Sequence, residues 1–263
     1  MRLRAALVVV AASLATVLTQ TGQASAGDGL GGPTPSIVGG TNATQTYSFM
    51  ASLQSTSGAH RCGASLISST WLVTAAHCVS GISPSGYQLR VGSVNRTTGG
   101  TLVRASRFVM HPNYDPWFTG RGDMALIQVA SAVPQAPISI SSTSPAAGTP
   151  SRILGWGQTC PTRGCGGAPT TLKQLDTSII TDSSCSSRVP FSSSTELCVN
   201  VPSGQGACYG DSGGPALVGT TTSWRLVGAT SRGTSSTCGA TPTIYTDVTA
   251  YRSWITSTTG IPV

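Results

Sequence analysis

Short apolar or alternating runs recur along the chain and are separated by Gly, Pro, Ser and Thr. The clearest runs span residues 65–73, 101–110, 124–129, 152–156, 172–180 and 224–230, and β-branched residues dominate them. Alternation with a period of two and β-branched side chains are typical of strands. Many short strands with turn residues between them predict an all-β fold of the sandwich or barrel kind.

Two segments depart from this strand pattern. Residues 248–258 carry Tyr251, Trp254 and Ile255 at the spacing of one helix face, which predicts a final helix docked on the β body. Residues 139–150 are rich in Ser, Pro, Ala and Gly, a composition typical of a linker. This linker divides the body into two halves of similar size, roughly 37–140 and 141–263.

Residues 1–26 have the layout of a secretory signal peptide. Arg2 and Arg4 precede an apolar run over residues 5–18, and a small-residue triplet follows at 24–26. The apolar run is shorter than the ~20 residues that a membrane-spanning helix needs, which disfavours the alternative of an uncleaved anchor. We therefore expect a secreted protein with no membrane partner, cut after residue 26.

The composition argues against several classes of protein. Only 9% of the 263 residues are charged, which disfavours a disordered chain and a coiled coil. Glycine and proline are plentiful but follow no Gly-X-Y period, so the chain is not collagen-like. The net charge of +7 comes from arginines that are scattered singly, without basic blocks and interleaved aromatics. We therefore expect no nucleic-acid partner.

All the cysteines follow the signal segment, and their even number in an exported chain indicates disulfides. The eight are Cys62, Cys78, Cys160, Cys165, Cys185, Cys198, Cys208 and Cys238. Eight cysteines can pair in many ways, so their number leaves the connectivity open. The chain has no Cys-x-x-Cys and no two histidines at ligand spacing, so we expect no metal site.

Three segments carry residues suited to hydrolysis by a serine nucleophile. They are residues 74–78 around His77, residues 122–127 around Asp123, and residues 209–215 around Ser212. Such chemistry needs a base to take the hydroxyl proton, an acid to orient the base, and donors facing the developing oxyanion. Histidine suits the base because its ordinary pKa lies near neutrality. The glycines beside Ser212 allow the tight backbone that the donors require.

Taken together in the order His, Asp, Ser, these segments resemble the chymotrypsin-type serine proteases over residues 37–263. The resemblance implies two antiparallel six-stranded β-barrels, an active site in the cleft between them, and a C-terminal helix. It implies His77 as general base, Asp123 as its orienting acid and Ser212 as nucleophile, with no cofactor. The backbone amides of Gly210 and Ser212 would form the oxyanion hole.

The same resemblance implies a disulfide pairing. It joins Cys62 to Cys78, Cys185 to Cys198 and Cys208 to Cys238, which leaves Cys160 and Cys165 to close a short local loop. The segment aligned with the family's calcium loop, residues 93–104, carries no acid, so we expect no calcium there.

The sequence from Ile37 to residue 40 resembles the mature start of the family, which makes residues 27–36 a pro-segment. In the family, the amine freed at this position pairs with the acid before the nucleophile, here Asp211, because a buried charge needs a partner. Ser36 stands where trypsinogen-like zymogens have Lys or Arg, so we expect self-activation after this small residue. His60 has two interpretations that stay open: it holds Asp211 before activation, or it is structural.

The residues aligned with the family's primary specificity pocket carry no acid. They are Gly206, Ala207, Tyr209, Ser231, Arg232, Gly233 and Thr243. An acid at the floor position, Gly206, would bind substrate Arg or Lys, so tryptic preference is not expected. The walls at Gly233 and Thr243 predict small to medium uncharged residues, with an aromatic preference as the alternative. Arg232 either favours acidic substrate residues or points to solvent.

We therefore expect a monomeric endopeptidase that acts on proteins or peptides and meets proteinaceous inhibitors. The alternative from another class is a non-catalytic binding protein on the same fold, and a third is an esterase. Residues 121–123 spell an adhesion tripeptide, but the triad role buries Asp123. The short, Ser- and Thr-rich chain indicates a bacterial source, in which case Asn42 and Asn95 are unmodified.

Overall fold

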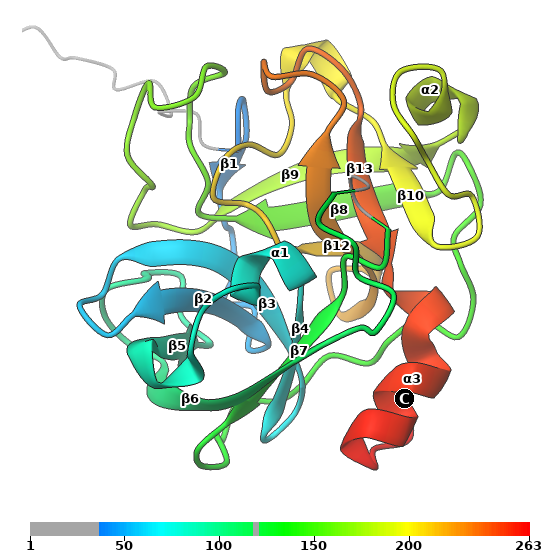
Figure 1. Ribbon diagram of the computed structural model, residues 1–263. Coiled ribbons are helices and arrows are strands. Elements are labelled where there is room, and N and C mark those ends of the chain that lie inside the picture. Colours follow the sequence, from blue (N-terminus) through cyan, green and yellow to red (C-terminus); the bar gives the residue numbers. More distant parts are fainter. Residues whose placement is uncertain (1–36, 118–120) are drawn as a thin grey trace, which may run out of the picture. The chain divides into compact units, whose positions relative to one another are not determined.

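The computed structural model describes residues 37–117 and 121–263 (Figure 1). The expected signal peptide and pro-segment, residues 1–36, lie outside the described residues. Two closed antiparallel barrels make up the body, each with six strands, as the resemblance implies.

The first barrel has the strand order β2-β3-β4-β7-β6-β5. Its strands are β2 (Met50–Ser55), β3 (His60–Ser68), β4 (Trp71–Thr74), β5 (Tyr87–Val91), β6 (Thr101–Met110) and β7 (Ala125–Val129). A one-turn helix, α1 (Ala76–Val79), and a 3-10 turn, η1 (Pro84–Gly86), follow β4. Apolar side chains such as Leu53, Leu66 and Leu72 fill the interior and are fully buried.

The second barrel has the order β8-β9-β10-β13-β12-β11, and the β11–β8 pair closes it. Its strands are β8 (Pro150–Gly155), β9 (Lys173–Ile180), β10 (Glu196–Val199), β11 (Pro215–Thr220), β12 (Ser223–Gly233) and β13 (Thr243–Asp247). A short helix, α2 (Ser183–Ser186), precedes β10, and a 3-10 turn, η2 (Pro202–Gly204), follows it.

The first strand of the body does not belong to the first barrel. β1 (Thr41–Asn42) pairs with β9 of the second barrel, with Thr41 opposite Gln174. The expected division at residue 140 is therefore wrong for residues 41–42. Gln174 also accepts a hydrogen bond from the backbone of Thr44, which holds the start of the body against the second barrel.

Most of the expected strand runs coincide with strands of the two barrels, and the expected run 65–73 is the exception. It contains the end of β3, a turn and β4, because the Ser68 hydroxyl accepts hydrogen bonds from the backbone of Thr70 and Trp71. A serine side chain that binds the backbone in this way replaces the strand pairing with a turn.

The chain ends in the predicted helix. A 3-10 turn, η3 (Val248–Tyr251), leads into α3 (Arg252–Thr259), and Gly260 ends it in a left-handed conformation at φ 73°. The rings of Tyr251 and Trp254 pack edge-on against His111, which follows β6, with centroids 4.8 and 5.0 Å away. The helix therefore covers the first barrel, although its chain leaves the second.

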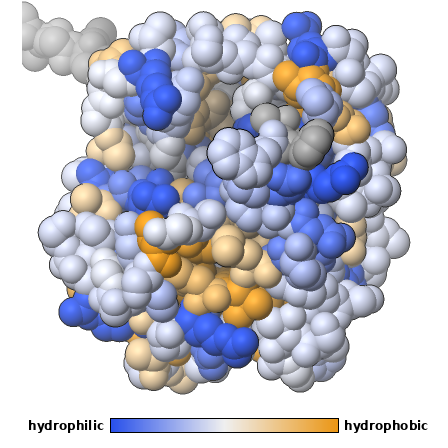
Figure 2. Space-filling view, in the orientation of Figure 1, coloured by the Kyte–Doolittle hydropathy of each residue, from blue (hydrophilic) through white to orange (hydrophobic). Residues whose placement is uncertain are grey.

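Few large apolar side chains are exposed among the described residues: Leu102, Met110 and Trp117. The face shown in Figure 2 is mostly pale or hydrophilic, and its hydrophobic colour gathers in limited areas. None of the described helices has the length and hydropathy to cross a membrane.

Candidate active site

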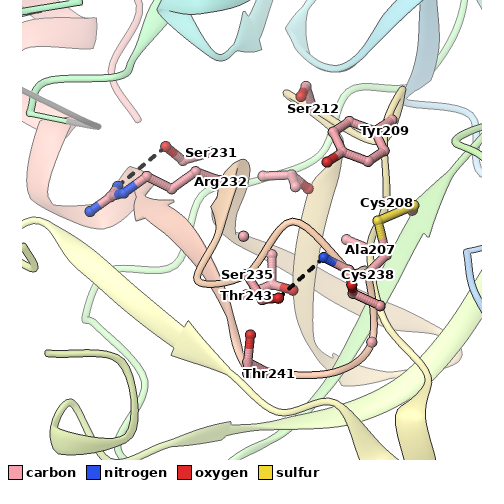
Figure 3. Close-up of a pocket in the computed structure, with 14 residues that line it drawn as sticks. Ala207, Cys208, Tyr209, Ser212, Ser231, Arg232, Ser235, Cys238, Thr241 and Thr243 are labelled. Atoms are coloured by element: carbon pink, nitrogen blue, oxygen red, sulfur yellow. Dashed lines mark hydrogen bonds between the residues drawn. A yellow bond between two sulfur atoms is a disulfide. The ribbon is translucent and has the colours of Figure 1, made fainter. Parts of the chain in front are cut away.

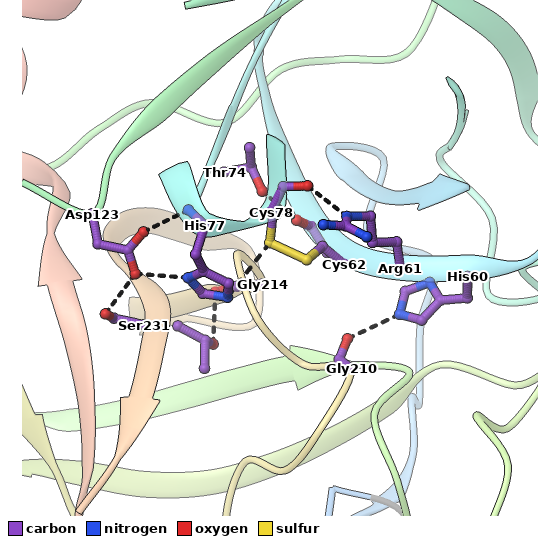
Figure 4. Close-up of a disulfide and its surroundings, with 12 residues drawn as sticks. His60, Arg61, Cys62, Thr74, His77, Cys78, Asp123, Gly210, Gly214 and Ser231 are labelled. Carbon is purple, nitrogen blue, oxygen red and sulfur yellow. Dashed lines mark hydrogen bonds and ion pairs between the residues drawn. A yellow bond between two sulfur atoms is a disulfide. The ribbon is translucent and has the colours of Figure 1, made fainter. Parts of the chain in front are cut away.

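His77 and Asp123 come from neighbouring strands of the first barrel. α1 follows β4, Asp123 precedes β7, and the two strands pair with Thr74 opposite Ala125. The Asp123 carboxylate accepts hydrogen bonds from the His77 backbone at 2.9 Å and from His77 Nδ1 at 2.8 Å (Figure 4). Because an ionised carboxylate can only accept, Nδ1 carries the proton and Nε2 is left unprotonated, as the expected role of base requires.

Asp123 is 2% exposed and is also held by the second barrel. The Ser231 hydroxyl, on β12, donates to Asp123 Oδ2 at 2.7 Å, and the Thr246 hydroxyl, on β13, donates to the Asp123 carbonyl. Burial on its own raises the pKa of Asp123, but the hydrogen bonds and charge of His77, with the Ser231 hydroxyl, hold that pKa below its ordinary value. A carboxylate enclosed in this way is not available to an adhesion receptor.

Ser212 lies on the loop before β11, and that loop touches the first barrel beside His77. The Ser212 carbonyl accepts a hydrogen bond from Gly63 of β3 at 2.8 Å. Gly213 has a positive φ of 73°, and a side chain there would collide with the Thr74 hydroxyl and the Gly63 carbonyl. Glycine at 213 therefore lets the nucleophile's loop approach the end of β4, just before His77.

His77 Nε2 contacts the Cys78 sulfur at 3.8 Å, which is a weak contact. Among the described residues, the Ser212 hydroxyl forms no hydrogen bond to His77 or to any other group. Catalytic hydrogen bonds are often long in a site without substrate and tighten when substrate binds.

Between residues 210 and 214, the described backbone leaves two amides without an acceptor. The N–H groups of Asp211, Gly213 and Gly214 all donate to backbone carbonyls. Within residues 37–117 and 121–263, those of Gly210 and Ser212 have no acceptor, and they are the pair expected to form the oxyanion hole. Gly210 has φ 98°, a conformation that glycine adopts without strain.

A cavity of about 330 Å³ opens beside Ser212 (Figure 3). Six of the seven residues predicted for the specificity pocket line it: Ala207, Tyr209, Ser231, Arg232, Gly233 and Thr243. Gly206 does not line it. Its amide donates to the Val38 carbonyl at 2.9 Å, and a side chain at 206 would meet Val201.

The cavity has further lining residues that were not among those expected to form the pocket, although Ser212 and the Cys208–Cys238 pair were expected in other roles. They are Cys208, Ser212, Thr230, Ser235, Thr237, Cys238, Gly239 and Thr241. Several lie on the connection from β12 to β13, which the Cys208–Cys238 disulfide ties to the segment before Ser212. The Ser- and Thr-rich composition of this connection is that of any turn, so it held no signal for a pocket wall.

The structure contains the same four disulfides as the resemblance implies: Cys62–Cys78, Cys160–Cys165, Cys185–Cys198 and Cys208–Cys238. Potential metal-binding atoms of Cys62, His77 and Cys78 lie within 4.8 Å of one another. Both sulfurs are bonded in the disulfide, so they offer no thiolates to a metal.

Comparisons with known proteins decide the family. The family model described as Trypsin matches residues 37–255. The chain belongs to the trypsin family. Trypsin alpha of Drosophila melanogaster is 36% identical over 231 residues, which is 84% of this chain and 87% of that protein. Trypsin beta of Drosophila erecta is 36% identical over 228 residues, covering 83% and 87%, and Trypsin of Sarcophaga bullata is 33% identical over 231 residues, covering 84% and 88%.

Membership of the trypsin family makes this protein a serine endopeptidase, a hydrolase whose substrates are proteins or peptides. The relatives compared are fly proteins, so they give no support to the bacterial source expected from the composition.

Asp211, which precedes Ser212 in this trypsin-family chain, is 1% exposed. Its carboxylate accepts from the backbone amides of Gly157 at 2.7 Å and Cys208 at 2.8 Å. Burial raises the pKa of Asp211 to about 7, and the two amides oppose that shift. Among the described residues, no cation pairs with this carboxylate.

His60 contacts the catalytic loop but not Asp211. Its Nε2 lies 2.9 Å from the Gly210 carbonyl, and its Nδ1 lies 2.7 Å from the Ser52 hydroxyl. Burial lowers the pKa of His60 to about 4, so the ring is neutral at neutral pH. A carbonyl can only accept, so Nε2 carries the proton and Nδ1 accepts from Ser52.

Arg232 does not point to solvent, and its charge is paired inside the protein. Its guanidinium makes two hydrogen bonds to Glu196 of β10, at 2.6 and 3.1 Å, and a third to the Pro190 carbonyl at 2.6 Å. The Glu196 side chain is 4% exposed, and that of Arg232 is 16% exposed. A buried carboxylate thus neutralises Arg232, because a charge taken out of water requires a partner.

Proposed function

We propose that this trypsin-family endopeptidase is secreted and works through an acyl-enzyme, with His77, Asp123 and Ser212 as its catalytic triad. The support is geometric. The Nδ1–Asp123 bond fixes the imidazole so that Nε2 is the free base, and the Ser212 loop lies against the strand that leads into His77.

In the first step, Ser212 Oγ attacks the scissile carbonyl carbon while His77 Nε2 takes the hydroxyl proton. The carbonyl oxygen becomes an oxyanion, which the unpaired amides of Gly210 and Ser212 stabilise. His77 then gives the proton to the leaving amine as the C–N bond breaks. A water molecule, deprotonated by His77, attacks the acyl-enzyme and releases the acid and the free Ser212 hydroxyl.

The observation that carries the substrate preference is the charge of the cavity beside Ser212. No carboxylate belongs to its described lining, and its one cationic side chain, Arg232, is paired with Glu196. A cavity without a carboxylate gives substrate Arg or Lys no charged partner. The side chain of Thr243, which is 5% exposed, narrows the pocket. These features favour small to medium uncharged residues before the scissile bond.

The start of the body supports activation by cleavage before Ile37. The Ile37 side chain is fully buried in the second barrel's core, and Val38 bridges to Gly206. Cleavage would free the amine of Ile37, and the buried carboxylate of Asp211 has no cation beside it among the described residues. An ion pair between this amine and the Asp211 carboxylate would order the loop that bears Gly210 and Ser212.

The test compares the secreted protein with its Ser212→Ala variant. The unaltered chain is expected to begin at Ile37 and to cleave a peptide amide with Ala before the bond, and the variant is expected to do neither. N-terminal sequencing and amide hydrolysis measure the two results. A variant that still begins at Ile37 without added protease contradicts self-activation, and a variant that still cleaves the amide contradicts the role of Ser212.

A further inference from the structure

The short loop closed by Cys160 and Cys165 is fixed to one wall of the specificity pocket. The Cys238 amide donates to the Pro161 carbonyl at 2.9 Å, and the Gln158 amide donates to the Tyr209 carbonyl at 2.8 Å. The Gln158 side chain also bonds twice inside the loop, to the Thr162 carbonyl and the Gly164 amide. These contacts, together with the disulfide, give the loop one position relative to the pocket.

Arg163 stands on this loop and is exposed. Its guanidinium carbon lies 5.5 Å from the ring centroid of Tyr209, a cation–π distance. Tyr209 lines the pocket, and its hydroxyl donates to the Ser236 carbonyl at 3.0 Å on the β12–β13 connection. The ring is thereby fixed beside the pocket, and it holds the Arg163 charge next to the substrate site.

No carboxylate among the described residues pairs with the Arg163 guanidinium. Ion pairs of the described residues join His77 to Asp123, Arg152 to Asp176 and Arg232 to Glu196, and Arg163 belongs to none of them. The guanidinium contacts the Tyr209 ring and, within the described residues, donates no hydrogen bond, so its N–H groups are left to donate to a ligand. Guanidinium N–H groups match a carboxylate in a two-bond geometry.

The position of Arg163 relative to His77 identifies the part of the substrate that it faces. His77 Nδ1 points to Asp123, which Ser231 also contacts, so Nε2 points away from Ser231. Figure 3 shows Ser231 and Tyr209 on opposite sides of the pocket, and Figure 4 shows Ser231 and Gly210 on opposite sides of His77. The leaving amine takes its proton from Nε2, so the residues after the scissile bond depart on the side of Tyr209 and Arg163.

We propose that Arg163 is a specificity-determining residue that binds a carboxylate side chain in the first or second substrate residue after the scissile bond. The inference rests on the proposed function, since it requires the serine-protease reaction at Ser212. The pocket would then select an uncharged residue before the scissile bond, and Arg163 would select an acidic residue after it.

The test uses the processed protein and internally quenched peptides with Ala before the scissile bond. Matched peptides carry Asp or Asn, and Glu or Gln, at the first and second residue after the bond. The kcat/KM ratio of acid to amide is expected to be about three- to fivefold at low ionic strength, the range of an exposed ion pair. It is expected to fall towards one in 0.5 M salt, because salt screens exposed charges.

Variants separate the charge of Arg163 from the structure of the loop. Arg163→Gln is expected to bring the acid-to-amide ratio to about one, Arg163→Lys to retain part of it, and Arg163→Glu to reverse it. Arg104→Gln, which removes an exposed arginine of β6, is the control and is expected to leave the ratio unchanged.

Two results would overturn the proposal. They are an acid-to-amide ratio of one in the unaltered protein and a ratio that survives Arg163→Gln. Cleavage of the amide peptides without an acid preference overturns this inference alone. Failure to cleave any peptide overturns the proposed function, and the inference falls with it.

Discussion

Three donors hold the Asp123 carboxylate: the His77 backbone, His77 Nδ1 and the Ser231 hydroxyl. In the proposed mechanism, a carboxylate in this position keeps the imidazole in the tautomer that leaves Nε2 free, and it stabilises the imidazolium formed when Ser212 loses its proton. The Ser231 bond comes from the second barrel, so both barrels fix the geometry of the base.

Ser231→Ala removes one of these donors and is expected to lower kcat/KM by roughly tenfold, since a hydrogen bond to a charged group contributes about 1.5–3 kcal/mol. The measurement is steady-state hydrolysis of a peptide amide, with the melting temperature as a check on folding. Ser235→Ala, which alters the same pocket without touching Asp123, is the control. A folded Ser231→Ala protein with full activity would contradict this role.

Among the strands of the second barrel, a buried ion pair links β10 to β12. Glu196 lies opposite Thr246, and Arg232 lies opposite Ile244, on the two edges of β13 between them. The pair therefore spans three neighbouring strands beside the specificity pocket, and it keeps Arg232 from presenting an uncompensated charge there.

Glu196→Gln is expected to destabilise the fold by about 3 kcal/mol or more, because it leaves the charge of Arg232 buried without a partner. The matched change is Asp176→Asn, which breaks the pair of Arg152, 11% exposed, with a carboxylate that is 69% exposed. That change is expected to cost less than Glu196→Gln, because water reaches the Asp176 side chain and Arg152 keeps its hydrogen bond to the Tyr47 hydroxyl. Denaturant unfolding of both variants measures the difference, and equal losses would contradict the account.

The strands that sequence patterns predicted and those that they missed differ in burial. β6 alternates between exposed and buried positions over part of its length, and its bounds agree with the predicted run. β10 and β13 are short, and every residue in them is buried, including Glu196, Thr246 and Asp247. Their polar side chains have partners elsewhere in the fold, such as Arg232 for Glu196. The local pattern of hydrophobic residues therefore could not predict these two strands.

The same distinction applies to the candidate site. His77, Asp123 and Ser212 lie in segments specific enough for sequence to suggest their roles. The Ser231–Asp123 bond, the His60–Gly210 bond and the pocket walls after residue 233 depend on long-range contacts. Residue type carries no signal for such contacts. β1 shows the same limit, because its partner β9 lies far away in the sequence.

At the scale of the whole molecule, Asp211 connects the proposed activation to folding stability. Its pKa is raised to about 7 by burial in the chain that still continues before Ile37. A carboxyl with a raised folded-state pKa contributes stability below its unfolded value near 4, and this contribution is lost as pH rises through about 7.

The uncut Ser212→Ala protein is therefore expected to lose stability between pH 4 and pH 7. Adding Asp211→Asn is expected to flatten this dependence, because the amide does not ionise. Melting temperatures of the two uncut proteins across this range measure the effect. Parallel pH profiles would show that Asp211 does not ionise unfavourably in the uncut chain.

The main proposal for this trypsin-family endopeptidase is a specificity pocket that carries no carboxylate. The most direct measurement is kcat/KM of the processed protein on peptide amides that differ only in the residue before the bond: Ala, Val, Leu, Phe, Arg and Glu. Ser212→Ala serves as the blank. We predict the highest kcat/KM for Ala, Val or Leu, and a shift of this preference towards Phe when Thr243→Gly widens the pocket. A preference for Arg in the unaltered protein would contradict the claim.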